Sequence, residues 1–151
     1  MYRAVTWLVQ QRGVEPQDAA AVDALLRGLD LQLQSLPCGG QQVLVNGEDV
    51  SQAIRSPEVT GAVSVVAAHR CVRQALTAQQ KALGAKGGLV AEGRDIGSAV
   101  FPDADLKVFL TATVAERARR RALDLEQRGF PVPERSVLEA QIAERDHCLL
   151  Y

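Results

Sequence analysis

The first 27 residues carry hydrophobic side chains at the spacing of an amphipathic helix. Val5, Leu8 and Val9 share one face, and apolar residues recur in the same way further along. This pattern predicts helices over residues 1–12 and 17–27.

From residue 29 the pattern changes to alternation, because Leu29, Leu31 and Leu33 are separated by polar residues. Two short apolar runs follow on either side of Asn46-Gly47, a dipeptide that strongly favours a two-residue hairpin turn. We therefore expect a small β insert within residues 28–60.

Helical spacing returns after the insert. Ser56 is a good cap and Pro57 a good first residue for a helix that runs, with a break near His69, to Leu83. Further on, Thr113 and Glu116 form a capping box.

The helix that this box opens is predicted to end at Gly129, and a last helix is predicted over residues 134–146. These two helices make up the segment 113–146. No internal repeat accompanies them.

Two apolar runs at residues 89–91 and 107–110 are too short for helices and are typical of strands buried on both faces. Strands that alternate with helices indicate an α/β fold with a parallel sheet. Two such strands are fewer than the usual number, about five. We therefore expect an incomplete α/β domain that lacks an opening or edge piece.

Charged residues gather where the first of these predicted strands ends. Glu92, Arg94 and Asp95 follow it directly, with Gly93 between the first two. Open α/β sheets bind ligands at the carboxyl ends of their strands, and two carboxylates around an arginine suit a polar, phosphorylated small molecule. The alternative is a buried salt-bridge network that closes the loop.

Arg117, Arg120 and Arg121 share one face of the helix predicted after Thr113. The planar fork of arginine suits bidentate contacts with phosphate. The alternative is a solvated face on which the arginines pair with neighbouring acids such as Glu116 and Asp124.

Composition narrows the classes of function. The 151 residues are 47% hydrophobic with a net charge of −1, which fits one globular domain and argues against a general affinity for nucleic acid or anionic membrane. Without a long apolar segment or a signal-peptide pattern, we expect a cytoplasmic monomer. The three cysteines are widely spaced, so free thiols are expected rather than a metal site. Among the basic residues, 14 are arginine and three are lysine, which agrees weakly with phosphate binding.

Taken in order, these segments resemble bacterial cytidylate kinases from the first residue to about Asp146. The GRDIG and VFPDA motifs at residues 93–97 and 100–104 are specific to this family among nucleotide kinases, and GEDVS at residues 47–51 fits its nucleotide-binding insert. Further matches are Tyr2-Arg3, Ile54-Arg55, Pro57-Glu58-Val59, Ser64, Val72-Arg73 and Glu144-Arg145-Asp146.

The resemblance implies a P-loop nucleoside monophosphate kinase fold, with residues 28–60 as the monophosphate-binding insert. It implies transfer of the terminal phosphoryl group of ATP, with Mg²⁺, to CMP or dCMP. It assigns the monophosphate to Arg3 and Arg94. It assigns the cytosine edge to Ser64, Arg73 and Asp95, with Glu92 alongside.

The resemblance also makes residues 113–146 the lid over ATP. Arg117 and Arg121 would lie on its first helix, and Arg145 on its far side, close to the phosphoryl group in transfer. Arg94 and Arg145 would then be the catalytic residues. The partners implied are the nucleotides CMP, dCMP and ATP, with neither nucleic acid nor membrane.

The chain departs from the family at both ends. The family begins with a strand and a GxxGxGK[GS]T phosphate loop that binds ATP and Mg²⁺, and this sequence contains no such motif. Beyond Asp146 the family continues with further charged lid residues, where this chain has residues 147–151. We therefore expect a partial domain that is inactive by itself. Some family members are fused behind a pantoate-activating ligase domain, which the sequence leaves open.

Two other functions stay open at this point. A kinase for another nucleoside monophosphate is disfavoured by the cytosine-reading set Ser64, Arg73 and Asp95. A non-catalytic nucleotide-binding or interaction module is favoured by the missing phosphate loop.

Overall fold

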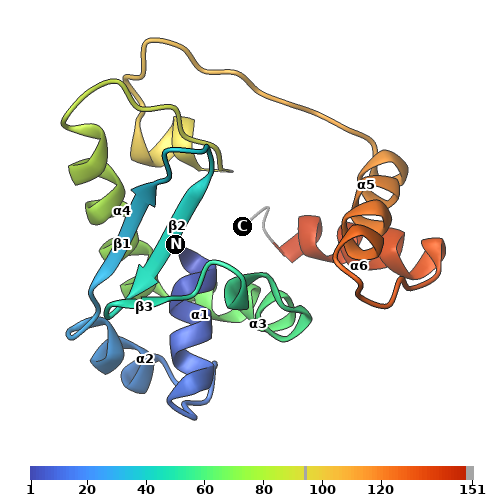
Figure 1. Ribbon diagram of the computed structural model, residues 1–151, viewed down its shortest axis with the longest axis horizontal. Coiled ribbons are helices and arrows are strands. Elements are labelled where there is room, and N and C mark those ends of the chain that lie inside the picture. The colour runs from blue at the N-terminus through green and yellow to red at the C-terminus, as the bar shows by residue number, and fades with distance from the viewer. Residues whose placement is uncertain (94, 149–151) are drawn as a thin grey trace. The chain divides into compact units, whose positions relative to one another are not determined.

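The computed structural model describes residues 1–93 and 95–148, and the chain divides into two compact units, Met1–Asp105 and Leu106–Tyr151 (Figure 1). The helices of the first unit are α1 (Tyr2–Gln11), α2 (Ala19–Leu26), α3 (Pro57–Ala68) and α4 (Arg70–Gly84), with a short 3₁₀ turn η1 (Ala53–Arg55) and a π-helical turn η2 (Ile96–Val100). Its sheet consists of β1 (Leu31–Ser35), β2 (Gln41–Val45) and β3 (Glu48–Asp49). The second unit consists of α5 (Val114–Gln127) and α6 (Arg135–Cys148).

The helices of the first unit lie where the sequence predicts them. Ser56 caps α3, since its Oγ accepts a hydrogen bond from the amide of Val59 at 3.3 Å, and Pro57 takes the first helical position. His69 is extended, with ψ of 129°, and this residue separates α3 from α4 as expected. Within the described ranges, no helix is both long and apolar enough to cross a membrane.

The predicted β insert forms an antiparallel sheet in the order β1-β2-β3. Leu31 pairs with Val45 and Leu33 with Val43, which puts the apolar side chains of both strands on one face. The turn from β2 to β3 is Asn46-Gly47, with φ of 51° and 84°. Positive φ at both residues is the requirement of the tight hairpin turn that the sequence predicts.

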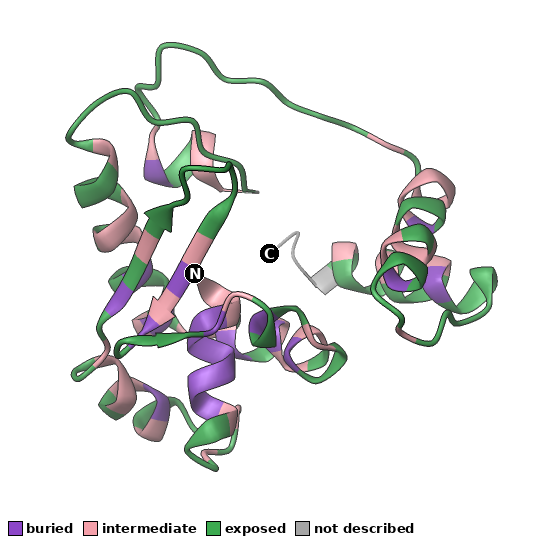
Figure 2. Ribbon diagram, in the orientation of Figure 1, coloured by how far each residue is buried: buried purple, intermediate pink, exposed green. Residues whose placement is uncertain are grey.

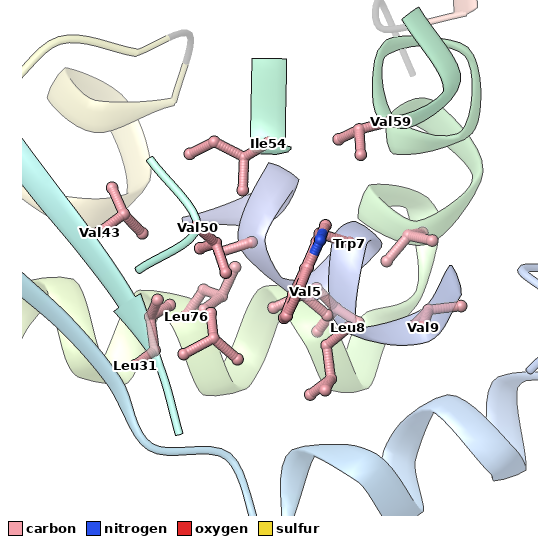
Figure 3. Close-up of a cluster of buried hydrophobic side chains, with 14 of the residues drawn as sticks. Val5, Trp7, Leu8, Val9, Leu31, Val43, Val50, Ile54, Val59 and Leu76 are labelled. Carbon is pink, nitrogen blue, oxygen red and sulfur yellow. The ribbon is translucent and has the colours of Figure 1, made fainter. Parts of the chain in front are cut away.

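The core of the first unit forms around α1, whose residues 4–9 are all buried (Figure 2). In Figure 3, side chains from α1 such as Val5 and Leu8 meet those of the sheet, η1, α3 and α4, among them Val43, Ile54 and Leu76. Burial of this apolar surface is the main stabilising contribution to the unit. It also fixes the first turn of α1, from which Arg3 extends.

The two predicted buried strands do not form. Residues 89–91 and 107–110 are irregular, and their apolar side chains are exposed, with Val90 at 98% and Phe109 at 92%. A strand is stable only when a neighbouring strand satisfies its backbone N–H and C=O groups. Among the described residues, the only strands are those of the antiparallel insert, and none of them lies beside these runs. The parallel sheet of the predicted α/β fold is therefore not formed by this part of the chain.

The second unit is a pair of helices with a small core of its own, formed by Ala118, Leu125 and Leu138. Thr113 caps α5 as predicted, since its Oγ1 accepts a hydrogen bond from the amide of Glu116 at 3.2 Å. The two helices therefore begin and pack as the capping box and the apolar spacing indicate.

Gly84, the last residue of α4, lies against the ring of Phe101, directly after η2. A Cβ at position 84 would overlap Cε1 and Cζ of Phe101. We therefore expect Gly84→Ala to lower the free energy of unfolding by about 1–3 kcal/mol. Gly61→Ala, at an open site of α3 where no atom lies within 4 Å of a new Cβ, is the matched control. It should raise stability by about 0.5–1 kcal/mol. Urea denaturation followed by circular dichroism measures the free energy of unfolding of both variants. An equal increase in that free energy for the two variants would show that η2 does not pack on α4.

Candidate functional site

Arg3 is held by two elements that pack against α1. Its Nη1 donates to the carbonyl oxygen of Ile54 at 3.0 Å and to Oγ1 of Thr60 at 2.9 Å. Ile54 belongs to η1, and Thr60 lies in the first turns of α3. Because the side chain is half-buried, its positive charge is screened less than at an open surface, which suits the binding of an anion.

One face of α3 connects this arginine to Arg73. Thr60, Ser64 and Ala67 follow each other at intervals of four and three residues, so they lie on the same side of the helix. Arg73 donates from Nε to the carbonyl oxygen of Ala67 at 3.0 Å. Arg3 and Arg73 are therefore attached to the same side of α3, roughly 10 Å apart along its axis at a rise of about 1.5 Å per residue. The half-buried Ser64 lies between the two attachment points.

Tyr2, Arg73 and Asp95 share one neighbourhood. Burial raises the pKa of the Tyr2 phenol above its ordinary value of 10.0, the negative charge of Asp95 raises it further, and Arg73 acts in the opposite direction. Asp95 is fixed at the start of η2, where its carbonyl oxygen accepts hydrogen bonds from the amides of Ala99 at 2.8 Å and Val100 at 3.2 Å. Two of the three residues that the resemblance assigns to the cytosine edge, Arg73 and Asp95, therefore lie around the same tyrosine.

Two further predicted residues lie in the loop before η2. Glu92 is exposed, which disfavours the buried salt-bridge network as an explanation of this loop. Arg94, predicted to be catalytic and to bind the monophosphate, lies outside the described residues. Its role stays a prediction.

Arg73 also borders an open hollow of about 370 Å³ along α4. The other residues that line it are Gln74, Thr77, Ala78 and Lys81. Arg73 and Lys81 give this hollow a positive character.

In the second unit, Arg117 makes a forked ion pair that joins its two helices. Nη1 lies 3.0 Å from Oδ1 of Asp146 and Nη2 lies 2.5 Å from Oδ2. The paired carboxylate raises the pKa of the Arg117 guanidinium. Arg145, the neighbour of Asp146, is exposed in the last turn of α6. The ion pair thus fixes the turn of α6 that carries Arg145.

The other arginines of α5 pair with acids on their own helix. Arg121 Nη1 lies 3.2 Å from Asp124, and Arg119 and Arg120 lie 2.8 Å and 2.7 Å from Glu116. These ion pairs match the alternative that the sequence leaves open, a solvated helix face on which the arginines pair with neighbouring acids and do not bind phosphate. Of the ion pairs named for this unit, the Arg117–Asp146 pair is the one that joins α5 to α6.

Glu116 makes the second unit sensitive to acid. Hydrogen bonds from Arg119 and Arg120 lower its pKa from 4.5 to about 2. Because the pKa of Glu116 is lower in the folded state, its charged carboxylate stabilises the folded helix α5. This contribution is complete above pH 4.5 and disappears as the pH falls toward 2. We expect Glu116→Gln to reduce the loss of α5 helicity over this range, and high salt to do the same, since the arginines are exposed. Circular dichroism checks this, with Glu126→Gln on the same helix as control. Identical acid titrations for wild type and Glu116→Gln would contradict the assignment.

Three residues next to predicted site residues carry no role in the sequence interpretation: Tyr2 and Thr60 in the first unit and Asp146 in the second. Thr60 follows the Ser56 cap by four residues, a spacing that permits a hydroxyl bond to the carbonyl oxygen of the cap. Its contact with Arg3 spans 57 residues of sequence, and that of Asp146 with Arg117 spans 29. No local pattern predicts either contact.

Residues 1–148 match the family model for cytidylate kinase. Three similar proteins are each called bifunctional pantoate ligase/cytidylate kinase. The one from Parasynechococcus marenigrum (strain WH8102) is 93% identical over 147 residues, which are 97% of this chain and 29% of the relative. Those from Synechococcus sp. (strain CC9605) and Prochlorococcus marinus (strain MIT 9303) are 85% and 68% identical, and the matched residues are 97% of this chain in both cases and 31% and 30% of the relatives. The chain therefore spans less than a third of the length of these relatives.

Proposed function

Because this chain belongs to the cytidylate kinase family, we propose that it supplies the nucleoside monophosphate site of an enzyme that transfers the γ-phosphoryl group of ATP to CMP or dCMP. The family implies the nucleoside monophosphate kinase fold. The described residues contribute the helices and the small antiparallel sheet to it.

The observation that carries the proposal is the shared attachment of Arg3 and Arg73 to one side of α3. A cation at each end of a polar stripe suits an elongated ligand with a phosphate at one end and a polar base at the other. We place the monophosphate at the Thr60 end, next to Arg3, and the base at the Ala67 end, next to Arg73.

Asp95 and Arg73 together suit cytosine. Cytosine presents an amino group that donates hydrogen bonds and a ring carbonyl that accepts them. The carboxylate of Asp95 accepts a hydrogen bond from the amino group, and Arg73 donates one to the ring carbonyl. The Ser64 hydroxyl can both donate and accept, so it can bond to either of these groups. Uracil has a carbonyl in place of the amino group, and the carboxylate repels it.

Phosphoryl transfer requires positioned charge more than covalent chemistry, and arginines provide that charge. Arg3 and Arg94 would orient the accepting monophosphate. Arg117, Arg121 and Arg145 would belong to a lid over ATP, with Arg145 nearest the transferred group. In this arrangement the Arg117–Asp146 pair holds the helix end that presents Arg145.

ATP and Mg²⁺ complete the reaction as co-substrate and cation. Among residues 1–93 and 95–148, no group of three or more acidic, histidine or cysteine side chains could hold a metal ion. The acidic, histidine and cysteine side chains of this part of the chain therefore do not fit a Mg²⁺ site built by protein ligands alone. The 151-residue sequence also lacks the glycine-rich loop and lysine that cradle ATP phosphates.

A CMP site without a phosphate loop for ATP predicts that the 151-residue chain binds CMP and does not phosphorylate it. Isothermal titration calorimetry should show at least tenfold tighter binding of CMP than of cytidine or UMP, since each lacks a partner for a charged side chain. A coupled assay with ATP and Mg²⁺ should show no CDP. Turnover by the 151-residue chain would overturn the second part, and equal binding of CMP and cytidine would overturn the phosphate site.

A chimeric enzyme separates a kinase from a non-catalytic nucleotide-binding module. In it, the present sequence replaces the matching 147 residues of the Parasynechococcus marenigrum relative. We expect this chimera to phosphorylate CMP in preference to UMP. A chimera that folds and still binds CMP without turnover would favour the non-catalytic module.

A further inference from the structure

The orientation of Arg3 is set by its contacts with the protein. Two hydrogen bonds leave from its Nη1, to the carbonyl oxygen of Ile54 at 3.0 Å and to Oγ1 of Thr60 at 2.9 Å. A guanidinium is planar, so two bonds that fix one nitrogen also fix the plane and the direction of the whole fork.

The two acceptors differ in kind. The Ile54 carbonyl is part of the backbone in the middle of η1, and no substitution of a side chain removes it. The Thr60 hydroxyl belongs to a side chain, so of the two acceptors it is the one that depends on the residue type at its position. It also donates to the carbonyl oxygen of Ser56 at 2.8 Å, so its hydrogen is committed there and its lone pairs are directed to Arg3.

The start of α3 gives the Thr60 hydroxyl this geometry. Ser56 caps the helix and Pro57 opens it, so the carbonyl of Ser56 lies one turn before Thr60. A threonine four residues after such a carbonyl can bond back to it. The result is a chain of bonds from Arg3 through Thr60 to Ser56, anchored in a capped helix.

We infer that Thr60 is a positioning residue that aims the Arg3 guanidinium at the phosphate of the bound nucleoside monophosphate. This inference rests on the proposed function, which places the monophosphate next to Arg3. Thr60 does not itself touch the nucleotide in this arrangement. Its loss should therefore weaken the recognition of the phosphate and leave the recognition of the base intact.

The test compares CMP with cytidine on the 151-residue chain by isothermal titration calorimetry. Thr60→Val keeps the shape of the side chain and removes the hydroxyl. We expect it to raise the Kd for CMP by about tenfold, the usual effect of one lost hydrogen bond to a charged group, and to leave the Kd for cytidine within about twofold. Thr60→Ser keeps the hydroxyl and should restore most of the CMP affinity.

Thr6→Val is the matched control. The Thr6 hydroxyl makes the same kind of backward bond, to the carbonyl oxygen of Tyr2 at 3.0 Å in α1. Its replacement removes a comparable helix bond and should leave the ratio of CMP to cytidine affinity unchanged. A Thr60→Val variant that weakens CMP and cytidine equally, or neither, would overturn the inference.

A second measurement does not depend on any nucleotide. Two bonds to Nη1 should slow the rotation of the Arg3 guanidinium, so its Nη signals should be resolved by ¹⁵N NMR in the wild type and averaged in Thr60→Val. Unchanged signals in Thr60→Val would overturn the positioning role. If those signals change as expected and the wild-type chain binds CMP no better than cytidine, the proposed phosphate site is wrong. The result would still show that Thr60 orients the Arg3 guanidinium.

Discussion

Replacement of Arg3 by alanine is expected to weaken CMP binding to the 151-residue chain by 10- to 100-fold and to leave cytidine binding nearly unchanged. Charge-assisted hydrogen bonds from an arginine to a phosphate contribute about 1.5–3 kcal/mol, and the fork provides more than one of them. Arg3 is half-buried and oriented by Ile54 and Thr60, so little of this contribution is lost in ordering the side chain on binding. Calorimetry with CMP and cytidine measures the difference.

Two variants control this experiment. Arg3→Lys keeps the charge and loses the fork, and it should fall between the wild type and alanine. Arg12→Ala removes an exposed arginine just beyond α1 and should bind CMP as the wild type does. Equal weakening by Arg3→Ala and Arg12→Ala would show that the overall positive charge matters and that the phosphate does not lie at Arg3.

Asp95→Asn is expected to narrow the preference for CMP over UMP by about 10- to 100-fold. An amide can turn its NH₂ group toward the uracil carbonyl, so the variant loses a charged bond to cytosine, of about 1.5–3 kcal/mol, and no longer repels uracil. Values of kcat/KM for both substrates in the chimeric enzyme measure the ratio. An unchanged ratio would mean that Asp95 only braces its loop.

The pKa of Tyr2 gives an independent check on the position of Asp95. The Asp95 charge contributes to the raised pKa of the phenol, so Asp95→Asn should lower that pKa toward its ordinary value. The chain has two tyrosines, so ultraviolet titration is best done with Tyr151→Phe present. Asp103→Asn, at an exposed acid of the same segment, is the control and should leave both the Tyr2 pKa and the base preference unchanged.

Local signals in the sequence were sufficient for the helices, the caps and the hairpin. Ser56-Pro57 and Thr113 begin helices because their side chains satisfy backbone amides within the same turn. Asn46-Gly47 forms its turn because both residues tolerate positive φ. Each of these requirements is met by residues that are neighbours in the chain, so the sequence alone determines them.

The runs at residues 89–91 and 107–110 mark the limit of that reasoning. Their composition predicts strands, and composition cannot provide the neighbouring strands that hydrogen bonding requires. The candidate site shows the same limit. The motifs pointed to Arg3, Arg73 and Asp95 through a family resemblance, and the sequence contains no sign of what holds each side chain.

Only the tertiary structure decided how these side chains are arranged. Packing of α1 against η1 and α3 brings Arg3 to a carbonyl and a hydroxyl more than 50 residues away in sequence. The break at His69 turns α4 so that Arg73 reaches back to Ala67. The sequence by itself determined the helices, their caps and the hairpin, because their hydrogen bonds are local. The fold decided the directions in which Arg3 and Arg73 point, because those directions depend on contacts beyond their own helices.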